Sequence, residues 1–202
     1  MKWKSAVLIL PLVLLAHRPA AAVETEEARL LVRSAVNDTL VAFAGKVQTP
    51  DEAQMAIKTI LGRYSDMETV SQRLLGRYWN RSAAEPRLEF STLLERFFIT
   101  AFGNMVRDIS ADERIEVRNA EVQGDHVVVH STSLSPGEEP LAVDWVVVDT
   151  AAGKPVIVDL SVDGVTVVTT MQADFTAVIR SASGRLEALF EPLRRKVSTL
   201  GG

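Results

Sequence analysis

The chain has 202 residues, and 47% of them are hydrophobic, which suits one domain with a substantial buried core. It contains no cysteine, so neither a disulfide nor a thiolate nucleophile is available. The formal net charge is −4, and an acidic chain with no basic patch in its sequence is a poor candidate for binding nucleic acid or an anionic membrane surface.

The first 22 residues have the organisation of a secretory signal peptide. A basic start precedes an apolar run from Ala6 to Ala16, and three alanines at 20–22 form a cleavage site. The run is too short for a transmembrane segment, which needs about 20 residues. We predict cleavage near Ala22 and a single domain over 23–202. Cleavage leaves 19 basic and 26 acidic residues, a net charge of −7.

Helical periodicity dominates the first half of the mature chain. Apolar residues spaced close to 3.6 predict a helix from Glu24 to about Lys46. The motif Thr49-Pro50-Asp51-Glu52 is a capping box with proline at the first helical position, so it predicts a second helix through Tyr64. A third, short helix is expected from Asp66 to Arg77.

A long, aromatic fourth helix is predicted next. Ser82-Ala83-Ala84-Glu85 repeats the capping-box spacing and marks its start. Four of the seven phenylalanines lie on this helix, and Phe90, Phe97 and Phe98 share one face with Leu94. Such a face usually belongs to the core, and the alternative is that part of it lines a cavity.

After Asp112 the apolar period changes from 3.6 to 2, which predicts strands. Two strands flank the turn at 123–125, and two more are expected over Leu141–Asp149 and Val156–Val162. Helical spacing returns over Thr166–Ser181 and in a last helix over Gly184–Val197, which Pro192 should kink. This order predicts an α+β fold: a helical N-terminal part packed on a four-stranded antiparallel curved sheet, with C-terminal helices, enclosing an apolar pocket.

Few residues suggest catalysis or metal binding. The sequence has no Gly-x-Ser-x-Gly elbow, no Gly-x-Gly-x-x-Gly and no phosphate loop. His126 and His130 are four apart on a strand, about 13 Å by strand rise, which is too far to chelate one metal ion. We therefore predict no catalytic residue, no metal site and no cofactor.

Asp159 and Asp163 are also four apart, a separation beyond that of the carboxylate pair in glycoside hydrolases. Asp163 precedes Gly164 and is expected to form a turn. Asp159 lies between Val158 and Leu160, and a covered carboxylate needs hydrogen-bond partners. We expect a structural role for it.

Two stretches resemble the MlaC family of periplasmic phospholipid-binding proteins, the toluene-tolerance or auxiliary ABC-transport family. Residues 75–82, Leu-Gly-Arg-Tyr-Trp-Asn-Arg-Ser, followed by Arg87-Leu88-Glu89-Phe90, are similar to the family's LG-x-x-W and QR-x-x-F patterns. Residues 158–167, with Phe175 and Gly184, resemble its V-x-DV-x-x-x-GVSLV-x-NYR-x-QF stretch. The resemblance covers nearly all of the mature chain.

The resemblance implies a periplasmic carrier, not an enzyme, that holds phospholipid tails in a pocket between sheet and helices. It implies shuttling between an outer-membrane lipoprotein complex and an inner-membrane ABC transporter with an MCE-domain protein, in support of outer-membrane lipid asymmetry. One branch of the family is associated with hopanoid biosynthesis, so a hopanoid or another polycyclic lipid is the alternative ligand. The chain departs from the family at Thr170-Met171-Gln172, where Asn-Tyr-Arg is usual, at Asp174 and at Pro155.

A carrier needs a deep apolar pocket, and large apolar residues at the boundary of helices and sheet are the candidates to line it. We expect a cavity of several hundred Å³, the usual range for ligand sites, between Phe97 and Val143. The predicted lipid-binding residues are Leu74, Trp79, Phe90, Leu94, Phe97, Phe98, Val143, Trp145, Val167, Met171 and Phe175.

Two other functions fit the same fold. A small-molecule α+β enzyme would use Asp159 or Asp144 as a base inside the pocket, with a raised pKa. An adaptor that binds proteins through its acidic surface would need no cavity. Hydrogen bonds from backbone donors to Asp159 would count strongly against the enzyme.

Overall fold

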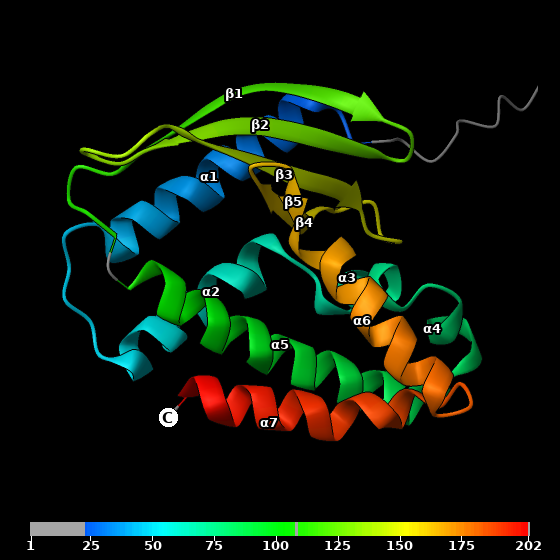
Figure 1. The fold of residues 1–202 in the computed structure, drawn as a ribbon. Helices are drawn as coiled ribbons and strands as arrows, with labels where there is room; N and C mark the ends of the chain where they lie inside the picture. Colours follow the sequence, from blue (N-terminus) through cyan, green and yellow to red (C-terminus); the bar gives the residue numbers. More distant parts are fainter. Residues whose placement is uncertain (1–22, 108, 202) are drawn as a thin grey trace, which may run out of the picture.

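The computed structural model describes residues 23–107 and 109–201. An antiparallel sheet lies over a layer of helices, with α1 directly beneath β1 and β2 (Figure 1). The helices are α1 Thr25–Phe43, α2 Pro50–Tyr64, α3 Met67–Leu75, α4 Arg77–Arg81, α5 Ala84–Val106, α6 Val167–Ser181, the 3₁₀ helix η1 Leu186–Leu189 and α7 Phe190–Gly201. The strands are β1 Arg114–Gln123, β2 His126–Leu134, β3 Leu141–Asp149, β4 Pro155–Val162 and β5 Val165–Thr166.

The predicted start of the second helix is confirmed. The Thr49 hydroxyl accepts a hydrogen bond from the Glu52 amide at 3.3 Å, and the Glu52 carboxylate accepts one from the Thr49 amide at 2.8 Å. This reciprocal pair satisfies two amides that the helix itself leaves free. Helix α3 ends at Leu75, two residues before the predicted end, and is followed by Gly76, whose φ of 51° favours glycine.

The second predicted capping box is wrong. Helix α5 begins at Ala84 after Ala83, and no side chain caps it. Ser82 instead donates its hydroxyl hydrogen to the Tyr78 carbonyl at 2.9 Å. Ser82 follows the end of the short helix α4, which was not predicted as a separate helix. Because its hydroxyl is hydrogen-bonded to α4, it does not cap the start of α5.

The sheet has five antiparallel strands in sequence order, β1-β2-β3-β4-β5. The α+β class is confirmed, and the fifth strand is a two-residue addition that pairs with the end of β4. Asp163 and Gly164 form the connecting turn with φ values of 48° and 79°. Positive φ at both positions is typical of the two-residue hairpin turn that Asp-Gly favours, so the predicted turn role of Asp163 is confirmed.

Helices contact both faces of the sheet near its β3–β4 end. Helix α1 covers the face that carries Val127, Val129 and Val147. Val148 and Val156 point the other way, because side chains alternate along a strand, and they join the core formed by α3, α5, α6 and η1. Residues from both faces of the sheet thus pack against helices.

Pro192 does not kink the last helix. Helix α7 begins at Phe190, so Pro192 lies in its first turn, where the amide of an ordinary residue would have no helical partner. The preceding residues form η1, a separate 3₁₀ turn. The helix also extends beyond its predicted end, to Gly201.

The predicted signal peptide, residues 1–22, lies outside the described residues. Within residues 23–107 and 109–201, no helix combines the length and apolar character needed to cross a membrane.

Gly45 provides a test of the packing between α1 and the start of the sheet. Its φ is 67°, and a Cβ there would lie 2.7 Å from the Ala111 Cβ. We expect Gly45→Ala to destabilise the protein by about 2 kcal/mol or more, because it adds backbone strain to a steric overlap. Denaturant unfolding measures the change.

Gly62→Ala is the matched control. Gly62 lies within α2, and nothing lies within 4 Å of its added Cβ. The same substitution should stabilise the protein by about 0.5–1 kcal/mol there, since alanine favours the helix. Equal effects at the two sites would contradict the proposed strain at Gly45.

Candidate functional site

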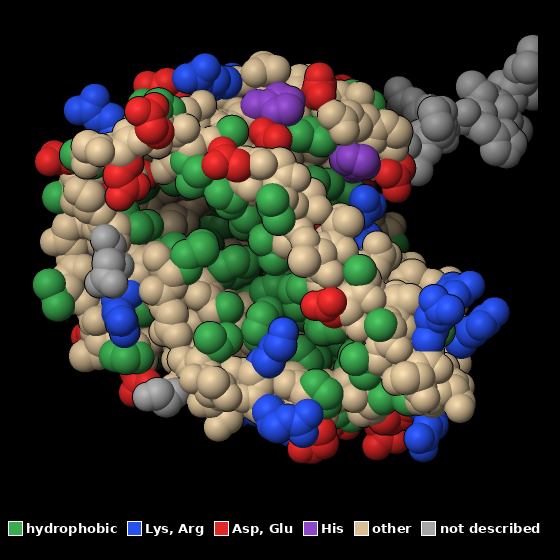
Figure 2. Space-filling model, viewed as in Figure 1, with side chains coloured by type: hydrophobic (Ala, Val, Ile, Leu, Met, Phe, Trp, Pro, Cys, Tyr) green, Lys and Arg blue, Asp and Glu red, His purple; other side chains and the backbone are tan. Residues whose placement is uncertain are grey.

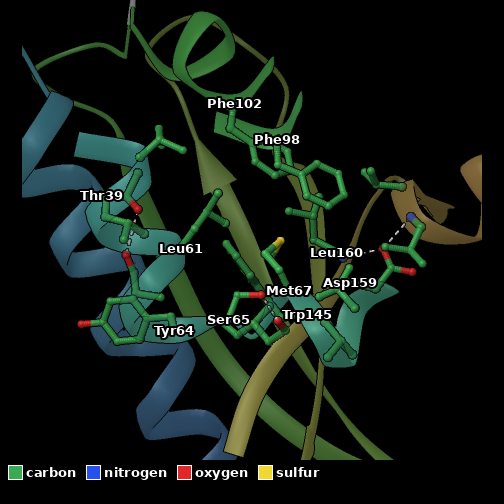
Figure 3. A pocket seen from close by; sticks show the side chains of 18 of the residues that line it. Thr39, Leu61, Tyr64, Ser65, Met67, Phe98, Phe102, Trp145, Asp159 and Leu160 are labelled. Atoms are coloured by element: carbon green, nitrogen blue, oxygen red, sulfur yellow. Dashed lines mark hydrogen bonds between the residues drawn. The ribbon is translucent and has the colours of Figure 1, made fainter. Parts of the chain in front are cut away.

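An apolar cavity opens between the helices and the inner face of the sheet. It appears as a hollow lined with hydrophobic side chains (Figure 2), and Figure 3 shows its wall from close by. Its volume is about 150 Å³. The lining residues are Ala35, Thr39, Ile57, Ile60, Leu61, Tyr64, Ser65, Met67, Val70, Phe98, Phe102, Met105, Val106, Trp145, Ile157, Val158, Asp159, Leu160, Val167 and Val168.

The polar side chains of this wall are engaged in hydrogen bonds to protein groups. The bonds run from Thr39 Oγ1 to the Ala35 carbonyl (2.8 Å), from Ser65 Oγ to the Ile157 carbonyl (2.7 Å), from the Tyr64 hydroxyl to Asp38 (2.7 Å) and from Trp145 Nε1 to Ser131 Oγ (2.9 Å). A polar atom satisfied in this way needs no water or polar ligand. The cavity therefore presents an almost entirely apolar surface.

A β-bulge lets β4 supply four consecutive lining residues. Val146 of β3 lies opposite Asp159, and Val147 lies opposite Ile157, so Val158 is an extra residue without a partner. A bulge bends the strand and interrupts the strict alternation of its side chains. Ile157, Val158 and Leu160 consequently all reach the cavity.

Asp159 links this bulged strand to helix α6. Its Oδ1 accepts hydrogen bonds from the amides of Leu160 at 2.8 Å and Val168 at 2.9 Å (Figure 3). Val168 lies in the first turn of α6, and the N-cap residue Thr166 makes no side-chain cap of its own. Asp159 thus caps the helix from another element, where a negative charge also favours the helix dipole. The predicted structural role is confirmed.

The electrostatic environment of Asp159 is mixed. Burial raises the pKa of its carboxyl group above the ordinary value, and the backbone hydrogen bonds from Val168 and Leu160 oppose that rise. A raised pKa is what the enzyme hypothesis expects. The same Oδ1 atom, however, is held by two backbone donors, and this arrangement counts strongly against a general base that must face a substrate.

Asp144 cannot serve as a base inside the cavity. It lies on the opposite, outer face of the sheet, where its Oδ1 is 2.8 Å from His130 Nδ1. The Nδ1 atom of His126 lies 3.0 Å from the Oδ1 atom of Asp125. Among the described residues, no group of three or more His, Asp or Glu side chains is arranged to hold a metal ion.

The eleven predicted lining residues separate into four groups. Phe98, Trp145 and Val167 lie on the cavity wall. The remainder lie elsewhere: Leu74, Trp79, Phe90, Leu94 and Phe175 are buried in the adjoining helical core, Phe97 and Met171 pack against that core, and Val143 is buried in β3.

The cavity also differs from prediction in place and size. It lies beside Phe98 and Phe102, not between Phe97 and Val143, and it is smaller than several hundred Å³. The rings of Phe98 and Phe102 stack with centroids 5.4 Å apart and occupy one side of the space (Figure 3). Side chains from α5 thus form one side of the cavity.

None of the eleven predicted lining residues lies on helices α1 and α2, which also contribute to the wall. Ile57, Ile60 and Leu61 of α2 line the cavity. The helical spacing of these residues predicts that they are buried. It does not predict whether they face the core or the cavity. The departures at Thr170 and Gln172 are exposed on α6 and do not line the cavity, and Gln172 donates to the Arg73 carbonyl at 3.3 Å.

The raised pKa of Asp159 predicts a pH-dependent contribution to stability. At a pH between the pKa of Asp159 in the unfolded chain and its higher pKa in the folded protein, the carboxyl group is protonated only in the folded protein. The stabilisation from this proton is therefore complete below the unfolded pKa, and it is lost as the pH rises through the folded pKa. Asp159→Asn keeps the acceptor oxygen and cannot ionise. We expect the unfolding free energy of the wild type minus that of the variant to fall over this pH range, as measured by denaturant unfolding.

A constant or rising difference between wild type and Asp159→Asn would contradict this assignment. A second variant, Asp159→Ala, removes the hydrogen-bond acceptor as well as the charge. Comparison with Asp159→Asn therefore isolates the contribution of the helix cap. Asp159→Ala should cost about 1 kcal/mol, the usual effect of losing an N-cap.

Comparisons with known proteins relate this geometry to a family. A solved structure of a phospholipid-binding protein from Ralstonia solanacearum, in complex with a phospholipid, matches with a TM-score of 0.76 and 20% identity, over 87% of this chain and 99% of that one. At this identity the likeness shows the fold. No curated protein matches the chain. The family model described as MlaC protein matches residues 33–195, so the resemblance seen in the sequence is confirmed and this chain belongs to the MlaC family.

Proposed function

We propose that this protein is a lipid carrier that binds the tails of a phospholipid in the apolar cavity. The observation that carries the proposal is a solvent-open cavity whose polar wall groups are hydrogen-bonded within the protein. Membership of the MlaC family and the fold shared with a phospholipid-binding protein support it.

The free energy of lipid transfer explains why the wall must be apolar. Each buried methylene contributes about 0.8 kcal/mol, so two chains of about 16 carbons represent on the order of 25 kcal/mol. A carrier must offer nearly the same shelter as the bilayer, or the lipid stays in the membrane. A hydroxyl or amide in the wall without a partner in the protein would weaken lipid binding, because an acyl chain that enters the cavity would displace the water bound to that group.

The volume of about 150 Å³ is smaller than the usual ligand site of about 300–1,000 Å³. Two acyl chains therefore require the walls to move apart, or the chains to extend through the open side. Met67 and Met105 lie in the wall, and methionine adapts readily to the shape of a neighbouring group. We retain Phe98, Trp145 and Val167 as tail contacts and add Leu61 and Phe102.

The proposal extends to transport. The carrier shuttles lipid through the periplasm between an outer-membrane lipoprotein complex and an inner-membrane ABC transporter that carries an MCE-domain protein. The signal peptide at residues 1–22 delivers it there. Catalysis has little support, since the two candidate bases are held by backbone amides or lie on the outer face of the sheet.

Lipid extraction tests the ligand directly. Mass spectrometry of organic extracts from the purified mature protein should find phospholipid in near-stoichiometric amount. A hopanoid or another polycyclic lipid in its place would overturn the phospholipid assignment and leave a carrier of a different lipid. Protein free of lipid after expression, and unable to take it up from vesicles, would contradict the carrier function.

Three methionines allow the same substitution inside the cavity, at its rim and outside it. Met67→Glu places a carboxylate in the wall, at the first residue of α3, where a helix tolerates an acid. Burying that charge against an acyl chain costs several kcal/mol, so we expect bound lipid to fall at least tenfold. Lipid-to-protein ratios measured by mass spectrometry give the result.

The other two methionines provide the comparison. Met105 lines the cavity but is 63% exposed, so Met105→Glu should have a smaller effect. Met55 is 64% exposed on α2 and does not line the cavity, so Met55→Glu should leave bound lipid unchanged. Equal losses at Met55 and Met67 would show that the cavity is not the lipid site.

A further inference from the structure

The acidic excess of the described chain lies in the sheet, because residues 23–107, which form α1 to α5, contain eleven Asp and Glu residues against eleven Lys and Arg residues. Residues 109–166, which form the sheet, contain eleven Asp and Glu residues against three Lys and Arg residues. Residues 167–201, which form α6, η1 and α7, contain three acids against five bases. Lys and Arg side chains are visible below the hollow, over α5 and α7 (Figure 2). The overall negative charge therefore conceals a basic region that the sequence analysis did not identify.

Part of this region is a groove between α5 and α7. It has a volume of about 750 Å³ and is lined by Phe97, Ala101, Pro192, Arg195, Lys196, Thr199 and Leu200. Its floor is mainly apolar, and Leu200 is 38% exposed. The Lys196 ammonium lies 5.9 Å from the centre of the Phe97 ring. The groove thus combines apolar surface with cations, whereas none of the residues that line the cavity is Lys or Arg.

The two cations of the groove are available to a partner. Arg194, next in sequence, forms ion pairs with Glu89 and Glu191. In the part of the chain that the structure describes, Arg195 and Lys196 form no ion pair, and both are exposed. They are therefore the residues of α7 whose charge is least compensated.

The groove borders the cavity. Phe98 and Phe102 of α5 line the cavity, while Phe97 and Ala101 line the groove. Successive positions on an α-helix are about 100° apart around its axis, so α5 itself forms the ridge between the two. The Phe97 and Phe98 rings are 5.7 Å apart across this ridge. A surface that contacts the groove is consequently separated from the cavity by helix α5 alone.

We infer that the α5–α7 groove is the face with which this protein meets an anionic phospholipid bilayer. The inference rests on the proposed carrier function and adds to it the surface for loading. Exposed Lys and Arg side chains beside apolar groups are the combination that attracts proteins to anionic lipid surfaces.

Charge segregation favours a bilayer over a single acidic protein helix as the occupant. A planar anionic surface attracts the groove and repels the sheet, with its eleven acids, so it orients the whole molecule. A protein helix in the groove would sense only the nearby cations. Two cations give weak attraction, and a shuttle needs weak attraction because it must leave the membrane again.

Vesicle co-sedimentation tests the inference. The full mature protein is mixed with vesicles of phosphatidylglycerol and phosphatidylcholine, or of phosphatidylcholine alone, at about 0.1 M salt, where the Debye length is about 10 Å. Binding should require phosphatidylglycerol. Each cation contributes about fivefold, so the double variant Arg195→Gln, Lys196→Gln should bind about 30-fold more weakly.

A matched control removes two lysines elsewhere. Lys58 on α2 and Lys154 in the β3–β4 turn are exposed, and neither lines the cavity or the groove. The double variant Lys58→Gln, Lys154→Gln has the same net charge as the groove variant. It should bind within about twofold of the wild type if the contact is local. Equal losses in both variants would overturn the inference.

The outcomes separate this inference from the proposed function. Protein that carries extracted lipid but does not bind anionic vesicles would overturn the membrane face, even if the groove then bound an acidic helix, and would leave the carrier function intact. Protein that never binds lipid in its cavity, yet shows groove-dependent vesicle binding, would support the membrane face and overturn the carrier function.

Discussion

The carboxylate of Asp159 connects the last long strand to the helix that closes the cavity. Its Oδ1 atom accepts hydrogen bonds from an amide of each element, that of Leu160 on β4 and that of Val168 on α6. The chain must turn from sheet to helix within a few residues, and the first amides of the helix would otherwise face an apolar wall without partners. The bulge at Val158 gives this connection its position, because it advances Asp159 relative to β3 while its neighbours stay at the cavity.

The two faces of the sheet have different chemistry for the same reason. Strand alternation sends valines and Trp145 toward α1 and the cavity, and it sends His130, Asp144 and Asp159 toward the outer face. Asp144, one of the two acids that suggested an enzyme, is therefore separated from the apolar space in which a substrate would bind. Asp159 borders both sides, and it is the one whose oxygen is committed to the backbone of α6.

A lipid carrier must balance shelter against release. The cavity wall is apolar and its polar groups are satisfied, which favours acyl chains over water. Its small volume means that binding two chains requires movement of the surrounding elements. The acidic sheet and the basic groove also give the molecule an uneven distribution of charge, which its net charge does not reveal.

The sequence by itself determined the local elements of this protein. The capping box at 49–52, the Asp163-Gly164 turn and the period-2 strands depend on residues close in the chain, and such interactions form wherever the segment folds. Family membership was also recoverable, since its motifs are short and continuous. Even the structural role of Asp159 followed from its covered neighbours.

Only the tertiary structure decided which apolar residues face the cavity. Phe97 and Phe98 are adjacent and equally hydrophobic, yet one borders the groove and the other the cavity, because α7 packs on one side of α5 and the cavity lies on another. Core and lining residues obey the same periodicity, so the pattern cannot distinguish them. The groove beside Arg195 and Lys196 was likewise invisible, since it depends on α5 and α7 lying side by side.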